Sequence, residues 1–138
     1  MIGSDVTATP AGGLGLLRRV LWTDAWGSGA LMLVLVVGAG AVGRFAGIPF
    51  GVPLGIGLGV IVPWVMLVAL VARRSPPPVR GATAIIAGNL GGVAAVVVVL
   101  IEFPDALLSR AEWALAFIGV GMLVLAVLEW IGLRRAIT

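Results

Sequence analysis

The chain has 138 residues, of which 61% are hydrophobic and 11% are charged, and its net charge is +3 at neutral pH. Soluble domains carry roughly 25% charged residues, so this composition excludes a water-exposed globular surface and predicts an integral membrane protein. The sequence has no cysteine and no histidine. It therefore excludes disulfides, thiolate or imidazole metal sites, a cysteine nucleophile and a histidine general base.

The first 22 residues are expected to differ from the rest of the chain. Residues 1–13 are small, polar and glycine-rich, which predicts a loose tail, and they lack the basic start and long apolar core of a signal peptide. Residues 14–22 are short and amphipathic. They either lie along the membrane interface or simply extend the first span. Residues 1–22 are thus assigned to a tail and amphipathic segment, and 23–138 to a transmembrane domain.

Four apolar runs predict the membrane spans. A helix needs about 20 apolar residues to cross about 30 Å of hydrocarbon, and the runs fall at about 24–43, 51–72, 81–101 and 109–133. The link between the first two runs is short enough to permit only an antiparallel hairpin. Ser109 and Glu112 have the spacing of a capping box at the start of the fourth span. The predicted fold is an all-α membrane four-helix bundle of two hairpins.

The arginines predict the orientation. Arg44 and Arg110 fall on one side of the four spans, and seven arginines fall on the other, three of them around a run of prolines that separates the two hairpins. The seven are Arg18, Arg19, Arg73, Arg74, Arg80, Arg134 and Arg135. Because positive residues are retained on the cytoplasmic side, both termini are expected in the cytoplasm. This scattered distribution is typical of topology marking and does not indicate nucleic-acid binding.

Glycines at every fourth position predict close helix packing. They are Gly51, Gly55 and Gly59 in the second span, and Gly88 and Gly92 in the third. Small residues let helices approach closely in lipid, so these glycines are expected chiefly to pack the four helices together. The alternative is that one glycine groove docks another subunit or an acyl chain.

The second span has two further notable residues. Pro63 lies in its middle and predicts a kink, because proline removes a helical hydrogen bond. Trp64 lies too deep for an interface position and is grouped with the glycines as a packing or partner surface.

Asp24, Asn89 and Glu129 are the candidate polar site. All three fall on the arginine-rich side and can meet in a folded bundle, and an ionisable group inside a membrane is a functional hypothesis by default. Each acid also has a structural explanation. Asp24 opens the predicted first span, where a helix N-terminus favours negative charge, and Glu129 is within reach of Arg134 and Arg135.

The chain resembles a family of uncharacterised bacterial four-span integral membrane proteins of similar length. The resemblance extends from about Arg18 onward and lies in residues 22–25, 28–29, 88–90 and 128–135. In that pattern an aromatic residue tends to follow the asparagine, whereas residues 91–93 here are Gly-Gly-Val. The resemblance implies no function, but it supports Asp24, Asn89 and Glu129 as a related set.

Two functions are left open. The leading hypothesis is a non-catalytic accessory or scaffold subunit of a larger inner-membrane complex for energy transduction or transport. The alternative is a small oligomeric transporter or channel with a cytoplasm-facing polar site. The lack of a carboxylate at the centre of any span counts against a coupled transporter, and small multidrug exporters carry a glutamate there. Neither catalysis, metal nor cofactor is expected. The expected partners are membrane lipids, one of which can be bound, and other membrane subunits or copies of the chain.

Overall fold

The computed structural model describes residues 11–138, and the four spans are all helical. The elements are α1 (Ala11–Val37), α2 (Ala39–Ala46), α3 (Gly51–Ile56), the π-helical η1 (Gly57–Ile61), α4 (Val62–Arg73), α5 (Val79–Glu102) and α6 (Ser109–Ile137). Over this range four helical stretches are long and apolar enough to cross a membrane: Gly12–Val37, Gly51–Arg73, Val79–Glu102 and Ser109–Ile137. The predicted membrane four-helix bundle is therefore confirmed.

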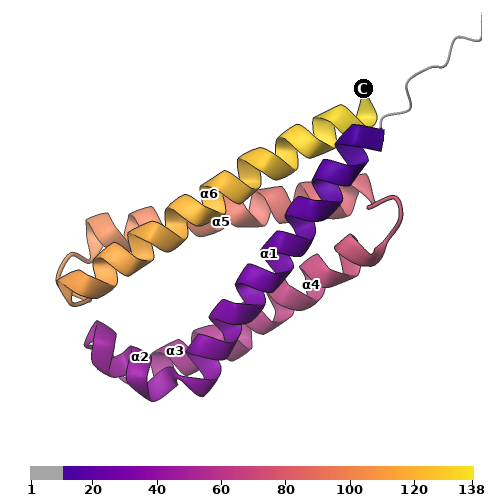
Figure 1. The fold of residues 1–138 in the computed structure, drawn as a ribbon. Helices are drawn as coiled ribbons and strands as arrows, with labels where there is room; N and C mark the ends of the chain where they lie inside the picture. Colours follow the sequence, from indigo (N-terminus) through magenta and orange to yellow (C-terminus); the bar gives the residue numbers. More distant parts are fainter. Residues whose placement is uncertain (1–10) are drawn as a thin grey trace, which may run out of the picture.

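Two helical hairpins make up the bundle (Figure 1). The first consists of α1 and α2 followed by α3, η1 and α4, and the second consists of α5 and α6. α1 packs against α6 of the second hairpin as well as against η1 and α4 of its own. The start of α1, the α4–α5 link and the end of α6 lie together (Figure 1), so this end carries the seven arginines. It is called the arginine-rich end below, and the other is the opposite end.

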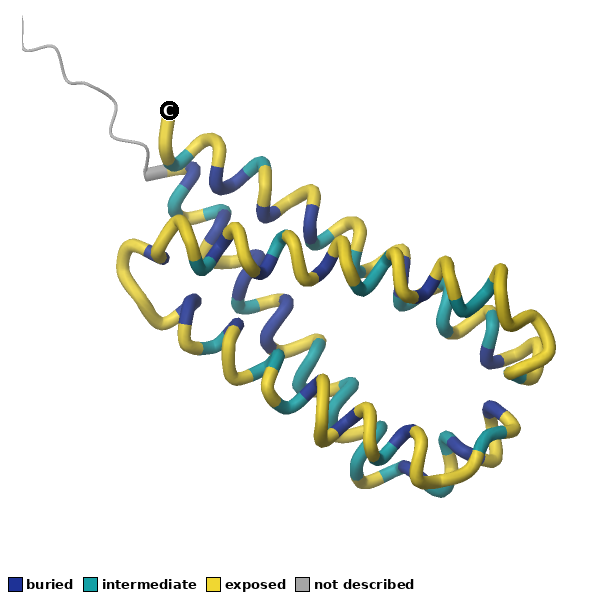
Figure 2. The backbone as a smooth tube through the Cα atoms, turned by 180° about the vertical axis from the view of Figure 1, so that it is seen from behind, coloured by how far each residue is buried: buried dark blue, intermediate teal, exposed yellow. Residues whose placement is uncertain are grey.

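A compact apolar core closes the arginine-rich end. Its buried members are Leu17, Leu21, Ala25, Val68, Val71, Ala72, Ala82, Ile85 and Leu133. Gly132 makes this packing possible, because a Cβ atom on it would lie only 2.9 Å from the Leu17 backbone. Figure 2 shows buried positions on several helices at this end. Small residues at such crossings let two helix backbones approach closely.

The segment 14–22 continues into the first span without a break. α1 runs without a break from Ala11, and both Leu17 and Leu21 are fully buried in the core. The segment is thus the extension of the first span, the second of the two interpretations. Residues 11–13, expected to be loose, open this helix, and the expectation for residues 1–10 lies outside the described part of the chain.

The kink expected at Pro63 takes the form of a π-helical turn. The amide of Val62 donates to the carbonyl of Gly57, five residues back, where an α-helix would use the residue four back. The wider turn ends at Ile61, two residues before the proline, whose ring and missing amide hydrogen disrupt regular helical bonding.

The capping box expected at Ser109 does not form. Leu108 holds the cap position, and no side chain caps the helix, because Ser109 is already its first helical residue. The Leu108 carbonyl instead accepts hydrogen bonds from the amides of Ala111, at 2.8 Å, and Glu112, at 3.1 Å. The helix start is therefore held by backbone groups alone.

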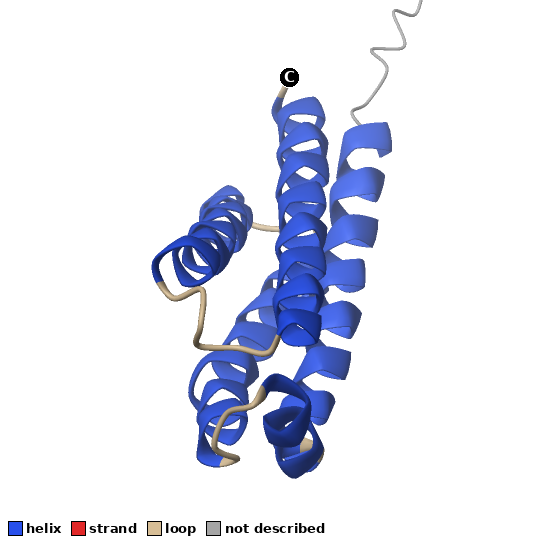
Figure 3. Cartoon of the chain, turned by 90° about the vertical axis from the view of Figure 1, so that its left-hand side faces the viewer, coloured by secondary structure: helices blue, strands red, loops and turns tan. Residues whose placement is uncertain are grey.

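A small set of polar contacts joins the hairpins at the opposite end. Arg110 donates from Nε to the carbonyl of Phe45, at 2.7 Å, and from a terminal nitrogen to that of Arg44, at 3.2 Å. Its guanidinium also lies 5.2 Å from the centre of the Phe45 ring. The amide of Leu108 donates to the Ala46 carbonyl at 3.0 Å. These contacts are called the Arg110 latch below. Figure 3 shows the loops that bring them together.

Candidate functional site

Asp24, Asn89 and Glu129 come together in one buried cluster. The side-chain nitrogen of Asn89 donates to Oδ2 of Asp24 at 2.9 Å and to Oε2 of Glu129 at 3.1 Å. Ser28 lies one turn after Asp24 on α1 and donates from its hydroxyl to Oδ1 of Asp24 at 2.8 Å. The three side chains of the candidate site are each 2% exposed or less. One amide on α5 thus links carboxyl groups from α1 and α6.

The structural explanations given for the two acids do not hold. α1 begins at Ala11, so Asp24 lies well inside the helix and far from its N-terminus, where the dipole effect is confined to the first turn. Arg134 places its guanidinium over the Trp130 ring, 4.9 Å from its centre. The hydrogen-bond partner of Glu129 is Asn89. Both acids are therefore held by the cluster.

The cluster has more acceptors than donors. Asn89 has two amide hydrogens, and the two carboxyl groups accept from its nitrogen. In the part of the chain that the structure describes, Oε1 of Glu129 is buried and lacks a hydrogen-bond partner. A buried polar atom without a partner is costly. The cluster therefore lacks a positive charge or a hydrogen-bond donor.

The two acids are close enough to repel each other when both are ionised. Their bonded oxygens lie 2.9 and 3.1 Å from the same nitrogen, so they are no more than 6 Å apart. Two full charges 6 Å apart repel by about 3 kcal/mol at an effective dielectric constant of about 20. This arrangement favours a cation or a proton near the pair.

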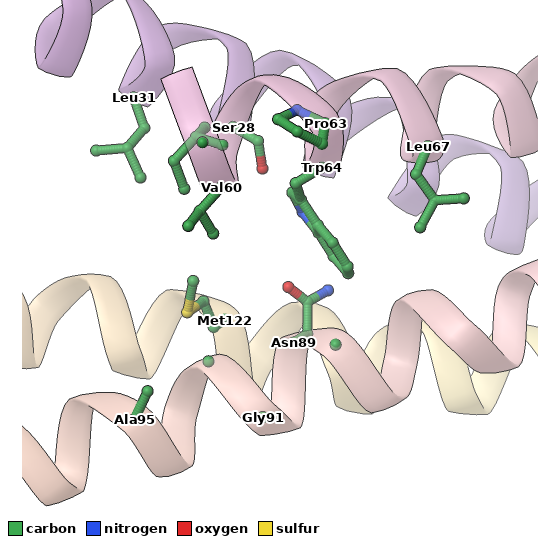
Figure 4. Close-up of a pocket in the computed structure, with 14 residues that line it drawn as sticks. Ser28, Leu31, Val60, Pro63, Trp64, Leu67, Asn89, Gly91, Ala95 and Met122 are labelled. Carbon is green, nitrogen blue, oxygen red and sulfur yellow. The ribbon is translucent and has the colours of Figure 1, made fainter. Parts of the chain in front are cut away.

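An apolar pocket adjoins the cluster between the two hairpins. Its volume is about 540 Å³, and Asn89 and Ser28 are the polar side chains among its lining residues. The remaining lining is apolar or glycine, from α1, η1, α4, α5 and α6, and includes Trp64 and Met122. In Figure 4, Trp64 reaches across from α4 toward Asn89 on α5. The pocket size lies within the range typical of small-molecule sites, about 300–1,000 Å³.

The cluster does not open toward the arginine-rich end as expected. Leu17, Val68 and Ile85 are fully buried and occupy the core on that side of the cluster. The pocket lies on the other side, since Leu31, Val60 and their neighbours are farther from the arginines along each helix. The pocket therefore adjoins the cluster from between the hairpins, where Asn89 and Ser28 line it, and the buried core separates the cluster from the arginine-rich end.

The glycines divide into two groups. Gly88 lies against the Trp64 ring and Gly92 against Met122, where an added Cβ atom would lie 2.8 Å from the sulfur, so both pack helices together as expected. By contrast, the stripe in the second span meets nothing within 4 Å: Gly51, Gly55 and Gly59. Internal packing was the wrong expectation for this stripe. Gly57 has that role, since its Cβ atom would lie 2.7 Å from Val36.

Trp64 faces inward. Its ring packs on the apolar core and covers Gly88, and it lines the pocket. It is therefore a helix-packing residue within the bundle. The sequence contained a signal for this role. A wide aromatic ring needs a small residue opposite it, and Gly88 was among the glycines expected to pack helices.

The sequence reasoning missed the pocket, the Arg110 latch and Ser28. Of these, Ser28 had a signal, because residues four apart on a helix are neighbours and a serine four positions after an aspartate can bond to it.

The described residues contain no group of three His, Cys, Asp or Glu side chains that could hold a metal ion. Comparison with family models, curated proteins and solved structures finds no match. The fold and site therefore define a four-helix membrane-spanning protein with a buried acidic cluster.

Proposed function

We propose that this chain is a small membrane transport protein that binds an apolar cation. The observation that carries the proposal is the cluster of two buried carboxyl groups on one amide, with one carboxyl oxygen left without a donor, beside an apolar pocket. This was the second of the two functions considered from the sequence. We rank it first because neither structural explanation accounts for the acids, and because Asp24 lies at the middle of α1, so the objection that no span has a central carboxylate no longer applies.

The charge of the ligand follows from the cluster. Buried carboxyl groups inside a membrane are costly unless they are paired, and they commonly mark ion or substrate paths. The amide nitrogen of Asn89 already donates to both acids, so it offers no further donor for an anion. A ligand with a positive charge would supply the partner that Oε1 of Glu129 lacks.

The apolar body of the ligand follows from the pocket. The lining beyond Asn89 and Ser28 is aliphatic, aromatic or glycine, so it would accept apolar groups and exclude small hydrated ions. Trp64 adds an aromatic face, which attracts cations by about 0.5–2 kcal/mol. Exposed residues such as Val60 and Ala95 lie at the pocket, and within a bilayer this side would admit a molecule dissolved in lipid.

The proposed location is the bacterial inner membrane, with both termini in the cytoplasm. Support for the orientation comes from the seven arginines gathered at one end, opposite Arg44 and Arg110. Transport requires the site to face each side in turn. The Arg110 latch consists of a few exposed hydrogen bonds, whereas a buried apolar core closes the arginine-rich end. The site would then open toward the outside by release of this latch.

Equilibrium dialysis of the purified protein in lipid nanodiscs tests the proposal. The probes are tetraphenylphosphonium and tetraphenylborate, which have nearly the same shape and opposite charges. Wild type is expected to bind the phosphonium, and the double variant Asp24→Asn/Glu129→Gln to bind it about tenfold more weakly or worse, a difference of about 1.4 kcal/mol. Glu102→Gln is the matched control, because Glu102 is an exposed carboxylate outside the cluster.

The anionic probe separates charge recognition from simple partition into lipid. Equal binding of both probes by wild type, or equal binding of the phosphonium by wild type and the double variant, contradicts the proposal. Transport itself is then measured as phosphonium uptake into liposomes that contain the protein, with the same control variant.

A second candidate, the accessory or scaffold subunit, is favoured by one observation. The stripe Gly51, Gly55 and Gly59 is open, and such a stripe lets a further membrane helix approach closely. Gly51→Leu/Gly55→Leu is expected to disrupt assembly, while Gly121→Leu, at an equally open glycine on α6, is not. A mild-detergent pull-down with mass spectrometry measures this, and recovery of the same proteins with both variants contradicts it.

A further inference from the structure

We infer that Asp24 and Glu129 hold one proton between them when the pocket is empty, and that the bound cation displaces this proton. The release step rests on the proposed function, whereas the shared proton does not. The same pair of carboxyl groups would then bind either the proton or the cation. The argument uses the hydrogen bonds of the cluster and the unpartnered oxygen of Glu129.

The two carboxyl groups compete for the same donor. Asn89 donates to one oxygen of each, which keeps these oxygens within 6 Å of one another in a fully buried site. Ser28 supplies a further donor, but only to Asp24. Asp24 therefore has two donors and Glu129 has one, so the negative charge is better accommodated on Asp24.

Oε1 of Glu129 is the carboxyl oxygen that remains free to carry the proton. Glu129 is completely buried, and its Oε1 has no hydrogen-bond partner among the described residues. A proton on Oε1 removes the full charge from this side chain and leaves Oε2 accepting from Asn89 as observed. Two carboxyl groups that share a site commonly hold one proton as a pair.

The other charged groups on these helices lie away from the cluster. Arg19 on α1 and Arg134 on α6 are each five residues from the nearer acid, about 8 Å along the helix, and both are exposed. The remaining charged residues of the packed helices are exposed and lie nearer to the helix ends than the acids do: Arg18, Arg73, Arg80, Glu102, Arg110 and Arg135. Glu112 lies in the first turn of α6, and Asn89 is the uncharged link on α5.

The exchange conserves charge in the site. Before binding, the pair has one carboxylate and one neutral acid. When the cation enters, the O–H bond of the acid breaks, the electron pair stays on the carboxylate oxygen, and the proton leaves to water. The site then contains two carboxylates and one cation, so its net charge remains −1. Each cation bound is therefore matched by a proton released.

Infrared spectroscopy of the ligand-free protein in nanodiscs at neutral pH tests the shared proton. A neutral carboxylic acid has a carbonyl stretch that is separate from the carboxylate bands. Wild type is expected to show this band, the double variant Asp24→Asn/Glu129→Gln to lack it, and Glu102→Gln to retain it. Absence of the band in folded wild type overturns the inference, and so does a band that persists in the folded double variant. Because the measurement needs no reagent to enter the site, it does not depend on access.

Calorimetry tests the release. Phosphonium binding is measured in buffers with different ionisation enthalpies, which gives the number of protons released for each cation bound, expected to be about one. Binding without proton release overturns the exchange and leaves the proposed function in place. A carboxylic acid band with no phosphonium binding overturns the proposed function and leaves the shared proton in place.

Discussion

The two ends of the bundle are held together by different interactions. At the arginine-rich end, four helices meet around fully buried aliphatic side chains such as Leu17, Val68 and Ile85. At the opposite end, the hairpins are joined through the exposed Arg110 and the backbone amide of Leu108. The pocket and the acidic cluster lie between these two closures. A closure made of many packed atoms acts as a hinge, and one made of a few hydrogen bonds separates more easily.

The two ends differ in the kind of interaction that stabilises them and in the surroundings of that interaction. In lipid, burial of aliphatic groups gives little hydrophobic driving force between helices, so the core depends on close packing of many atoms. The latch depends on hydrogen bonds worth about 1 kcal/mol each in an exposed position. This comparison predicts which substitutions should unfold the bundle and which should only open it.

Gly132→Leu is expected to have the largest effect. Its Cβ atom would meet the Leu17 backbone at 2.9 Å, so α1 and α6 must separate and the core is lost. Overpacking of this kind costs about 3 kcal/mol. Unfolding in mixed micelles measures the loss, and Gly121→Leu, which has open space around it, is the control. Equal stability of the two variants would show that the core does not hold this end.

Asn89→Leu is expected to destabilise the bundle by about 2 kcal/mol and to abolish phosphonium binding. The substitution removes the shared donor and leaves two buried carboxyl groups facing each other. Ser28→Ala removes one hydrogen bond to Asp24 and should cost about half as much. The unfolding experiment and the dialysis assay measure both quantities. Normal binding by a folded Asn89→Leu variant would place the ligand elsewhere.

Arg110→Ala removes two exposed hydrogen bonds and is expected to cost about 1–2 kcal/mol while releasing the latch. Because the chain has no cysteine, pairs of spin labels can be introduced cleanly. Labels at Phe50 and Phe103, both exposed near the latch, should move apart. Labels at Thr23 and Thr83, toward the arginine-rich end, should not.

Arg44→Ala is the matched control for the latch, since only the backbone carbonyl of Arg44 accepts from Arg110. This variant should keep the distance distribution of wild type. Separation of the labels in both variants, or in neither, would remove the distinction between the two ends.

Gly55→Ala is expected to have the smallest effect. The added methyl group meets nothing within 4 Å, so stability should change by less than about 0.5 kcal/mol. Gly57→Ala, two residues on, places the same group 2.7 Å from Val36 and should destabilise the first hairpin. Thermal unfolding of the two variants compares them directly. A clear loss with Gly55→Ala would indicate that this face is packed after all.

Hydropathy was sufficient to predict the spans, but it was insufficient for their ends and their rotation. The apolar runs are long, whereas the start of α1 contains Gly12, Gly13 and Gly15, which weaken any helix prediction. That missed start gave Asp24 a position at a helix end. The prediction of which helix face packs inward failed for another reason. When all faces of a helix are apolar, the sequence does not distinguish a packed glycine such as Gly57 from an open one such as Gly55.

The site was predictable in its members and unpredictable in its bonding. Depth along the spans brought Asp24, Asn89 and Glu129 to one level, which required only residue counting. That Asn89 serves both acids depends on the angles between α1, α5 and α6, and side-chain patterns do not encode these angles. The pocket likewise arises from how the two hairpins diverge between their closures.

The π-helical turn gives the second span a phase shift. An α-helix advances about 100° for each residue, and the turn at Gly57–Ile61 accommodates one residue more than a regular turn. Deleting one residue there would restore a regular helix and rotate one part of the span against the other by about that angle. Trp64 would then lose its place over Gly88, or the glycines before the turn would exchange their open and packed faces. A single-residue deletion in this turn would therefore alter the walls of the pocket without changing any residue that contacts the acids.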